Sequence, residues 1–347
     1  MILAPHDKGW LALDVVSTAG IDTFAFSIDE HPMWVYAVDA HYIEPLKVDV
    51  LTVANGDRYS VFIKLDKVYG DYGIRVASKA ATQVIDTTAI LSYGGEISQR
   101  ACPRRNYAKR QEPPFTNGTA SYGSSKNLVI SKRYVNRIGE SIEANVTQFD
   151  QAKMRSFPPE FPQPAPAPAQ TYFMHMHTSA NSYTWALNST PLYHPLLDDL
   201  SPPLLWQNPL DFETGDNLTI ITKNNTWVDL IFITHELLAP PHPIHKHSNK
   251  VFILGQGEGD FNWTSVEKAA AAIPQNFNLM TPPYRDGFVV PPSSLKPTWL
   301  AVRYHVVNPG PFMLHCHIQS HLNGGMAMVI LDGVDAWPEV PEEYKNL

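Results

Sequence analysis

The chain has 347 residues and carries a formal net charge of −8. This length favours two domains or a little more, each long enough to bury its own core. The acidic balance argues against a nucleic-acid partner. No apolar run approaches the ~20 residues that a membrane-spanning helix needs, so a membrane span is not expected.

Short runs of β-branched and aromatic residues recur along the chain, separated by Gly, Pro, Asn and Asp. Such spacing is typical of β-sandwiches and barrels. Helical periodicity is confined to short stretches such as Val266–Ile273 and the acidic tail near Glu342. The sequence therefore predicts an all-β fold, with strands that include Leu51–Val53, Val61–Ile63, Leu218–Ile221, Leu230–Ile233, Val289–Val290 and Met328–Leu331.

A Pro-rich segment divides the chain. Residues 158–168 read PPEFPQPAPAP, a composition that favours a stiff, extended spacer. We predict one domain over residues 1–150, a linker over 151–170 and a second domain over 171–347. The basic residues within 103–125 are expected to lie on a solvated loop rather than on a nucleic-acid surface.

Two histidine clusters lie in the second predicted domain. The first reads His242-Pro243-Ile244-His245-Lys246-His247, and the second reads His315-Cys316-His317, followed by His321 and Met326. Imidazole, thiolate and thioether are soft or borderline ligands that suit copper. If the second run is a strand, Cys316 faces away from both neighbouring histidines, so one segment could contact two metal centres.

Together the clusters supply a complete blue-copper ligand set, with His242, Cys316 and His321 in a trigonal plane and Met326 as the axial ligand. Zinc is the main rival because cysteine and histidine also bind it, but structural zinc sites favour a Cys-x-x-Cys spacing that is missing here. A purely structural role, with a buried thiol, is disfavoured by the combined pattern. The remaining histidines, which point to a further copper site, are His245, His247, His315 and His317.

These residues resemble the multicopper oxidases, and within them the fungal laccases. The resemblance also covers Val251–Gly257, Tyr284–Asp286 and Asn308–Pro311. One departure is Ser248-Asn249, where the family has Gly-His after its His-x-His; it lies outside the ligand set. The resemblance implies a type 1 copper on His242, Cys316, His321 and Met326, a type 2 copper on His245, and a type 3 pair on His247, His315 and His317.

The amino-terminal part resembles the middle domain of laccases, in Phe24–Asp29, Val35–Asp39 and the turn at Gly56–Val61. The resemblance sharpens the expected fold to two cupredoxin-like Greek-key β-barrels joined by the Pro-rich linker. The family takes half of its trinuclear ligands from a first domain whose histidine motifs are missing near Met1. We therefore expect an oxidase without its first domain, with a complete type 1 site and half-liganded type 2 and type 3 sites. His175-Met176-His177 is interpreted as a structural or surface pair.

Sequons of the Asn-x-Ser/Thr type are frequent and fit a glycosylated protein that is secreted or associated with the cell wall. Residues 1–7 lack the basic start and apolar core of a signal peptide, as expected if a first domain is missing. Cys102 has no partner within the chain except Cys316, so pairing with a missing part and a buried thiol both stay open. The sequons lie at Asn117, Asn145, Asn188, Asn217, Asn224 and Asn262.

The resemblance implies a copper-dependent oxidoreductase. Electrons would pass one at a time from a phenol or another small reductant to the type 1 copper, then through Cys316 to His315 and His317, and reduce dioxygen to water. Methionine at position 326 favours a lower potential and easily oxidised substrates, such as polyphenol precursors of fungal pigment. Ascorbate oxidase and ferroxidase activities are alternatives. A further alternative, from a different class, is a copper-binding or electron-transfer fragment without oxidase turnover.

Overall fold

The computed structural model describes residues 1–4, 9–79, 84–93, 132–160, 170–179, 183–188, 190–192, 204–208 and 219–344. Regular structure in these residues is almost entirely β-strand, which confirms the all-β prediction. Cys102, the loop over 103–125 and most of the Pro-rich segment lie outside the described residues. No helix in the described part is both long enough and apolar enough to cross a membrane.

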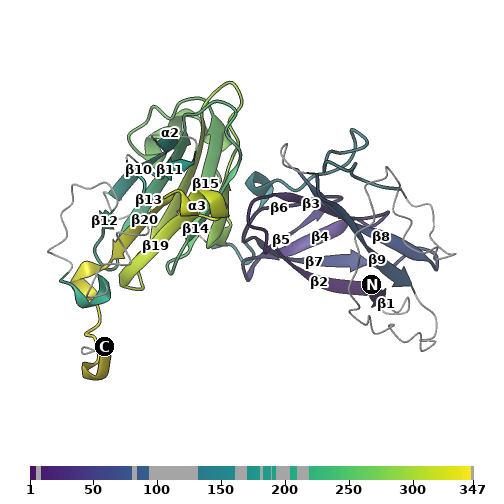
Figure 1. Cartoon of the computed structure of the whole chain (residues 1–347), viewed down its shortest axis with the longest axis horizontal. Coiled ribbons are helices and arrows are strands. Elements are labelled where there is room, and N and C mark those ends of the chain that lie inside the picture. Colours follow the sequence, from purple (N-terminus) through teal and green to yellow (C-terminus); the bar gives the residue numbers. More distant parts are fainter. Residues whose placement is uncertain are drawn as a thin grey trace, which may run out of the picture.

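The described residues form four sheets, two in each half of the chain (Figure 1). In the amino-terminal half, one sheet has the order β1-β9-β8-β3-β6 and the other β2-β7-β4-β5. The strands are β1 Ile2–Ala4, β2 Trp10–Val16, β3 Phe24–Ile28, β4 Met33–Val38, β5 His41–Val48, β6 Leu51–Val53, β7 Arg58–Lys64, β8 Asp71–Ser78 and β9 Asp86–Tyr93.

In the carboxy-terminal half, a six-stranded sheet has the order β11-β10-β13-β18-β15-β16 and a five-stranded sheet the order β12-β20-β19-β14-β17. The strands are β10 Gln170–Ser179, β11 Thr184–Ala186, β12 Thr219–Ile221, β13 Trp227–Thr234, β14 His242–Lys246, β15 Val251–Glu258, β16 Tyr284–Arg285, β17 Gly287–Val290, β18 Thr298–His305, β19 Gly310–Cys316 and β20 Ala327–Asp332. Short helices complete it: α2 Val266–Ala272, α3 Gln319–Asn323, and 3-10 turns at Leu204–Trp206, Pro274–Asn276, Val334–Ala336 and Glu342–Tyr344. A further 3-10 turn, Gln151–Lys153, belongs to the segment between the halves.

The burial pattern of a strand shows whether one or both of its faces are covered. In β7 the residues alternate, with Tyr59, Val61 and Ile63 buried and their neighbours more open, as expected for a sheet with one covered face. Strand β13 is buried along its whole length because both of its faces are covered. One apolar cluster lines its inner face, and a second cluster under α2 lines its outer face.

The predicted helix over Val266–Ile273 is confirmed as α2, and Ser265 caps its amino end by accepting a hydrogen bond from the Lys268 N–H. The acidic tail forms only the 3-10 turn Glu342–Tyr344. The strand expected through His315-Cys316-His317 ends at Cys316. His317 lies beyond it because the chain turns into α3, while the His317 N–H donates to the Pro243 carbonyl at 2.6 Å.

A partly buried ion network joins the two halves. Arg285 is fully buried and donates to Asp39 at 2.9 Å and to Asp57 at 2.7 Å, while Arg58 donates to Asp286. Asp39, Asp57 and Arg58 belong to the amino-terminal half, whereas Arg285 and Asp286 belong to the other. The network therefore fixes the two halves against each other at the start of β17.

Candidate metal centre

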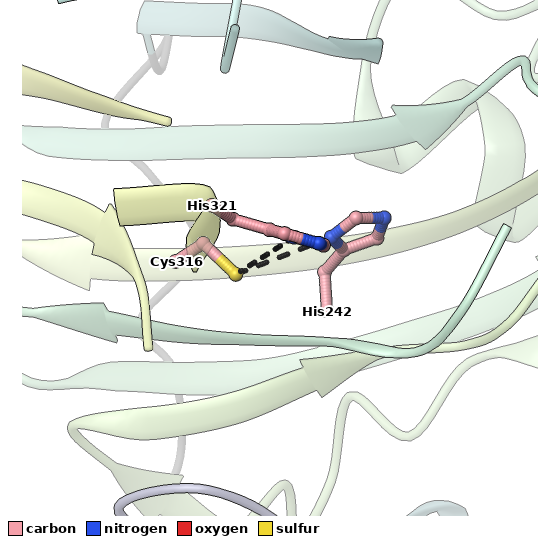
Figure 2. Close-up of side chains that lie close together, drawn as sticks. All are labelled: His242, Cys316 and His321. Carbon is pink, nitrogen blue, oxygen red and sulfur yellow. Dashed lines mark hydrogen bonds between the residues drawn. The ribbon is translucent and has the colours of Figure 1, made fainter. Parts of the chain in front are cut away.

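Three ligating atoms converge inside the carboxy-terminal half, as Figure 2 shows. Cys316 Sγ lies 4.0 Å from His242 Nδ1 and 3.8 Å from His321 Nδ1, and all three atoms lie within 4.8 Å of one another. An ion at the centre of a triangle with sides of about 4 Å would be about 2.3 Å from each atom, which matches a metal–thiolate bond and slightly exceeds the metal–imidazole bond of about 2.0–2.1 Å. The three residues, called the triad below, therefore fit a metal ion.

The triad is assembled by three elements of the fold. His242 opens β14, Cys316 closes β19, and the two strands pair antiparallel with Ile244 opposite Cys316. His321 comes from α3, directly after β19. Two main-chain hydrogen bonds hold Met326 beside the triad. The Met326 carbonyl accepts from the Cys316 N–H at 3.0 Å, and the Met326 N–H donates to the His321 carbonyl at 2.9 Å. Met326 is fully buried.

Burial sets the protonation of the triad. It lowers the pKa of His242 to about 3, with help from His321, and it lowers the pKa of His321 to about 4. Both imidazoles are therefore neutral near pH 7, which is the form that binds a metal. Burial raises the pKa of the Cys316 thiol to about 12 in the metal-free protein. A bound cation would displace this proton, because a coordinating thiol is deprotonated.

Trp185 covers the two histidines of the triad. Its ring stacks on His321 with the centroids 4.0 Å apart and meets His242 edge-on at 5.3 Å. The Trp185 N–H of the main chain donates to the Gly324 carbonyl at 3.0 Å, which ties β11 to the end of α3. The sequence alone does not mark this residue, because a lone tryptophan far from both clusters carries no local signal.

The four other predicted histidines gather beside the triad but on the opposite side of β19. His247 Nε2 lies 3.3 Å from His315 Nε2. The Nδ1 of His245 donates to the Asp286 carbonyl at 3.0 Å, and the Nδ1 of His315 donates to the Cys316 carbonyl at 2.9 Å. These bonds place the ring proton on Nδ1 and leave Nε2 of both rings deprotonated, which is the form that can bind a metal. The group, called the open set, consists of His245, His247, His315 and His317.

The open set is looser and wetter than the triad. Its ring centroids lie 4.8 to 6.4 Å apart. Among the described residues, no three of its members reach the mutual spacing of 4.8 Å that the triad shows. The His245 side chain is 28% exposed, whereas the triad is buried. The open set therefore resembles part of a ligand shell rather than a closed site.

The amino-terminal half forms one wall of the open set. Gly56 has a φ of +79°, and a Cβ placed there would lie 2.6 Å from the His317 ring. Glycine is needed at this position for both reasons, the left-handed backbone and the close approach. The Asn55 side chain also reaches the His317 carbonyl at 3.5 Å.

The departure at Ser248-Asn249 has a structural role away from the ligands. Asn249 is buried, and its amide donates to Asp332 at 2.9 Å and to the Asn308 carbonyl at 3.1 Å. Its side-chain oxygen accepts from the main-chain N–H groups of Val307 and Asn308. Asn249 therefore fastens the end of the first histidine cluster to the loop that leads into β19.

The structure brings all eight predicted metal-site residues into one region of the carboxy-terminal half. His175 and His177 lie elsewhere on β10, and His175 contacts His235, a residue that no sequence motif marks. His235 lies 60 residues from His175 in the sequence, so only the pairing of their strands could have predicted this contact.

Two family models described as multicopper oxidase match this chain, one over residues 11–96 and the other over residues 166–336. A multicopper oxidase of Phaeosphaeria nodorum is 39% identical over 96% of this chain and 49% of its own length. Laccase abr2 of Aspergillus fumigatus is 39% identical over 95% of this chain and 51% of its own length. The chain therefore spans about half the length of the curated relatives it matches.

Solved structures share the fold. A laccase from Botrytis aclada superposes with a TM-score of 0.70 at 22% identity, covering 98% of this chain and 54% of that one. A multicopper oxidase that functions in iron import superposes with a TM-score of 0.64 at 17% identity, covering 98% of this chain and 60% of that one. These likenesses support a cupredoxin-like fold for the described sheets.

Proposed function

Because the chain belongs to the multicopper oxidase family, we propose that it is the copper-binding part of a laccase-like oxidoreductase. Such an enzyme oxidises phenols and reduces dioxygen to water. The observation that carries the proposal is the convergence of two neutral, buried imidazoles on the Cys316 thiol. This ligand set, completed by a thioether, suits copper.

The proposed ligand roles follow the two sides of β19. His242, Cys316 and His321 would hold a type 1 copper, with Met326 as the axial ligand. On the other side, His245 would hold a type 2 copper, and His247, His315 and His317 would hold a type 3 pair. The open set supplies only half of a trinuclear ligand shell. Bound copper would supply the one-electron chemistry that links a phenolic reductant to dioxygen.

The chain's own residues keep the triad dry and join it to the open set. Trp185 and the surrounding core exclude water from His242 and His321. Cys316 is bonded through the main chain directly to His315 and His317. The Cys316 carbonyl also accepts a hydrogen bond from the His315 ring at 2.9 Å. The residues between the two sites are therefore few and directly connected.

Substrate, compartment and domain limits are part of the same proposal. Relatives named laccases and a thioether at position 326 support easily oxidised phenols, such as pigment precursors. Sequons at Asn145, Asn188, Asn224 and Asn262 support a secreted or cell-wall-associated glycoprotein. We place one domain at 1–150 and the second at 171–347, because two sheets end by Tyr93 and the other two begin at Gln170.

Copper loading of the purified chain tests the triad. The loaded protein should show the blue absorption of a cysteine–copper site, and Cys316→Ser should abolish it. Cys102→Ser, which removes the other cysteine, serves as the matched control and should stay blue. A colourless wild type, or a blue Cys316→Ser variant, would show that the type 1 assignment is wrong.

An electron-transfer protein without oxidase turnover is the second candidate, and the incomplete open set favours it. Stopped-flow mixing separates the two. A phenol should bleach the blue band in both cases, because this step needs only the triad. Recovery of the band on adding oxygen supports the oxidase for this chain by itself. A band that stays bleached supports electron transfer alone.

A further inference from the structure

A third group of histidines lies away from the triad and the open set. His175 and His177 are two residues apart on β10, and His235 directly follows β13. The two strands pair in parallel, with His175 opposite Ile233 and Met176 opposite Thr234. Continuing this register by one residue places His177 beside His235.

All three side chains belong to one face of the six-stranded sheet. Phe173 on β10, and Ile231 and Ile233 on β13, pack in the cluster under α2. Residues that are two apart on a strand share a face, so His175, His177 and His235 continue this face beyond its apolar part. None of the three is buried, so an ion from solution can reach them.

Two of the rings already face each other. His175 Nδ1 lies 2.8 Å from His235 Nε2, and the rings stack with centroids 5.1 Å apart and planes 16° apart. Partial burial, His235 and His177 all lower the pKa of His175, so its ring is neutral at pH 7. The Nδ1 of His177 donates to the His175 carbonyl at 3.1 Å, which leaves its Nε2 free as a ligand.

We propose that His175, His177 and His235 form a surface site for a first-row divalent cation, with Cu²⁺ bound more tightly than Zn²⁺. Two nitrogens that share an ion at bonds of about 2.0–2.1 Å lie roughly 3 Å apart, close to the 2.8 Å between His175 Nδ1 and His235 Nε2. The proton of this hydrogen bond moves to the other nitrogen of its ring when the ion binds. Among the described residues, these three histidines do not bring three ligand atoms within 4.8 Å of one another, so the His177 ring must rotate toward the other two. The result would be three imidazoles with an open fourth position, which is an established ligand set, and nitrogen ligands favour Cu²⁺ over Zn²⁺. The site uses no residue of the triad or the open set.

The surrounding residues place this site next to the triad. Thr178 follows His177 and pairs with Trp185, whose ring stacks on His321. Glu236 follows His235, accepts hydrogen bonds from Thr178, and acts on His321 through its negative charge. A cation bound here would therefore lie on the side of the molecule where the triad is covered by β11.

Copper titration of the full chain, followed by calorimetry and electron paramagnetic resonance, tests the proposal. Wild type should bind one Cu²⁺ with a nitrogen-ligand spectrum and no blue absorption, in addition to the copper at the other sites. His235→Gln and His175→Gln should each lose this one equivalent, and His177→Gln should weaken it. The control is His305→Gln, since His305 is another non-buried histidine, stacked on Trp227 and paired with Asn225.

Circular dichroism confirms that each variant is folded, and the blue band reports the triad independently. Loss of the non-blue equivalent in His235→Gln, with the blue band kept, supports the site. Equal copper binding in His235→Gln and His305→Gln would overturn it, even if the triad assignment holds. Zn²⁺ titration ranks the metals, and tighter Zn²⁺ than Cu²⁺ would contradict the stated preference.

Discussion

The two sides of β19 organise histidines in opposite ways. On the Cys316 side, two buried imidazoles and a buried thiol converge, supplied by β14, β19 and α3 of the carboxy-terminal half. On the His315 side, four imidazoles spread over a junction whose other wall comes from the amino-terminal half. A ligand set inside one core can be completed by that core. A set at a junction takes its final shape from whatever packs against it.

The largest expected effect is that acid destabilises the copper-free protein through the two buried histidines of the triad. An unfolded histidine takes up a proton near its ordinary pKa of 6.5, whereas folded His242 and His321 stay neutral down to about 3 and 4. Between these values only the unfolded state gains protons, so the free energy of unfolding of the copper-free protein falls as the pH drops from about 6.5 towards 4. The loss is on the order of 3 kcal/mol for each histidine.

Urea unfolding at several pH values measures this loss. The variant His321→Gln removes one of the two titrating groups, so its free energy of unfolding should fall less steeply over the same range. His305→Gln is the control and should follow wild type. An identical slope in His321→Gln and wild type would contradict the assigned pKa of His321.

The junction should be most sensitive at Arg285. Arg285→Met removes the cation that Asp39 and Asp57 share, so buried Asp57 loses its cation and buried Asp39 keeps only Arg58, at 3.5 Å. Breaking a buried ion pair in this way costs about 3–5 kcal/mol. Because the network lies beside His245, copper binding by the open set should weaken while the blue band of the triad stays. Unfolding and metal titration measure the two effects.

Arg137→Met is the matched control for Arg285→Met. Arg137 is exposed and pairs with Asp86 at the surface, where an ion pair contributes about 0–1 kcal/mol. If the two variants lost equal stability, the network at Arg285 would not be what holds the halves together.

The smallest expected effect on stability comes from Trp185, which covers the triad but not the open set. Trp185→Leu removes the ring that stacks on His321, at a cost of about 1 kcal/mol for the aromatic contact. The triad becomes wetter, so the pKa of His321 should rise from about 4 towards its ordinary value. Titration by nuclear magnetic resonance follows this shift. Trp10→Leu, at a half-exposed site, should leave it unchanged.

Sequence alone was sufficient where the signal is local. The alternation of β-branched runs predicted the strands, and the predicted ligands of the second histidine cluster lie within twelve residues of one another. His317 was assigned to a strand wrongly, because nothing in the triplet marks the turn into α3. Trp185, Arg285 with its partners, and His235 were not predicted as contacts. Each meets its partner through strand pairing or domain packing, which a single sequence does not display.

Lys246 shows how a strand that carries metal-site histidines also constrains the residues between them. It lies between His245 and His247 on β14, so strand alternation sends its side chain into the core. There it meets Asp332 at 3.1 Å and the face of Tyr304 at 4.1 Å. Replacing either charge alone would leave its partner buried and unpaired, whereas exchanging both for apolar residues of similar volume can be neutral. Lys246 and Asp332 should therefore vary together over evolutionary time, and a designer who transplants the histidine strand into another sheet must carry Asp332 with it.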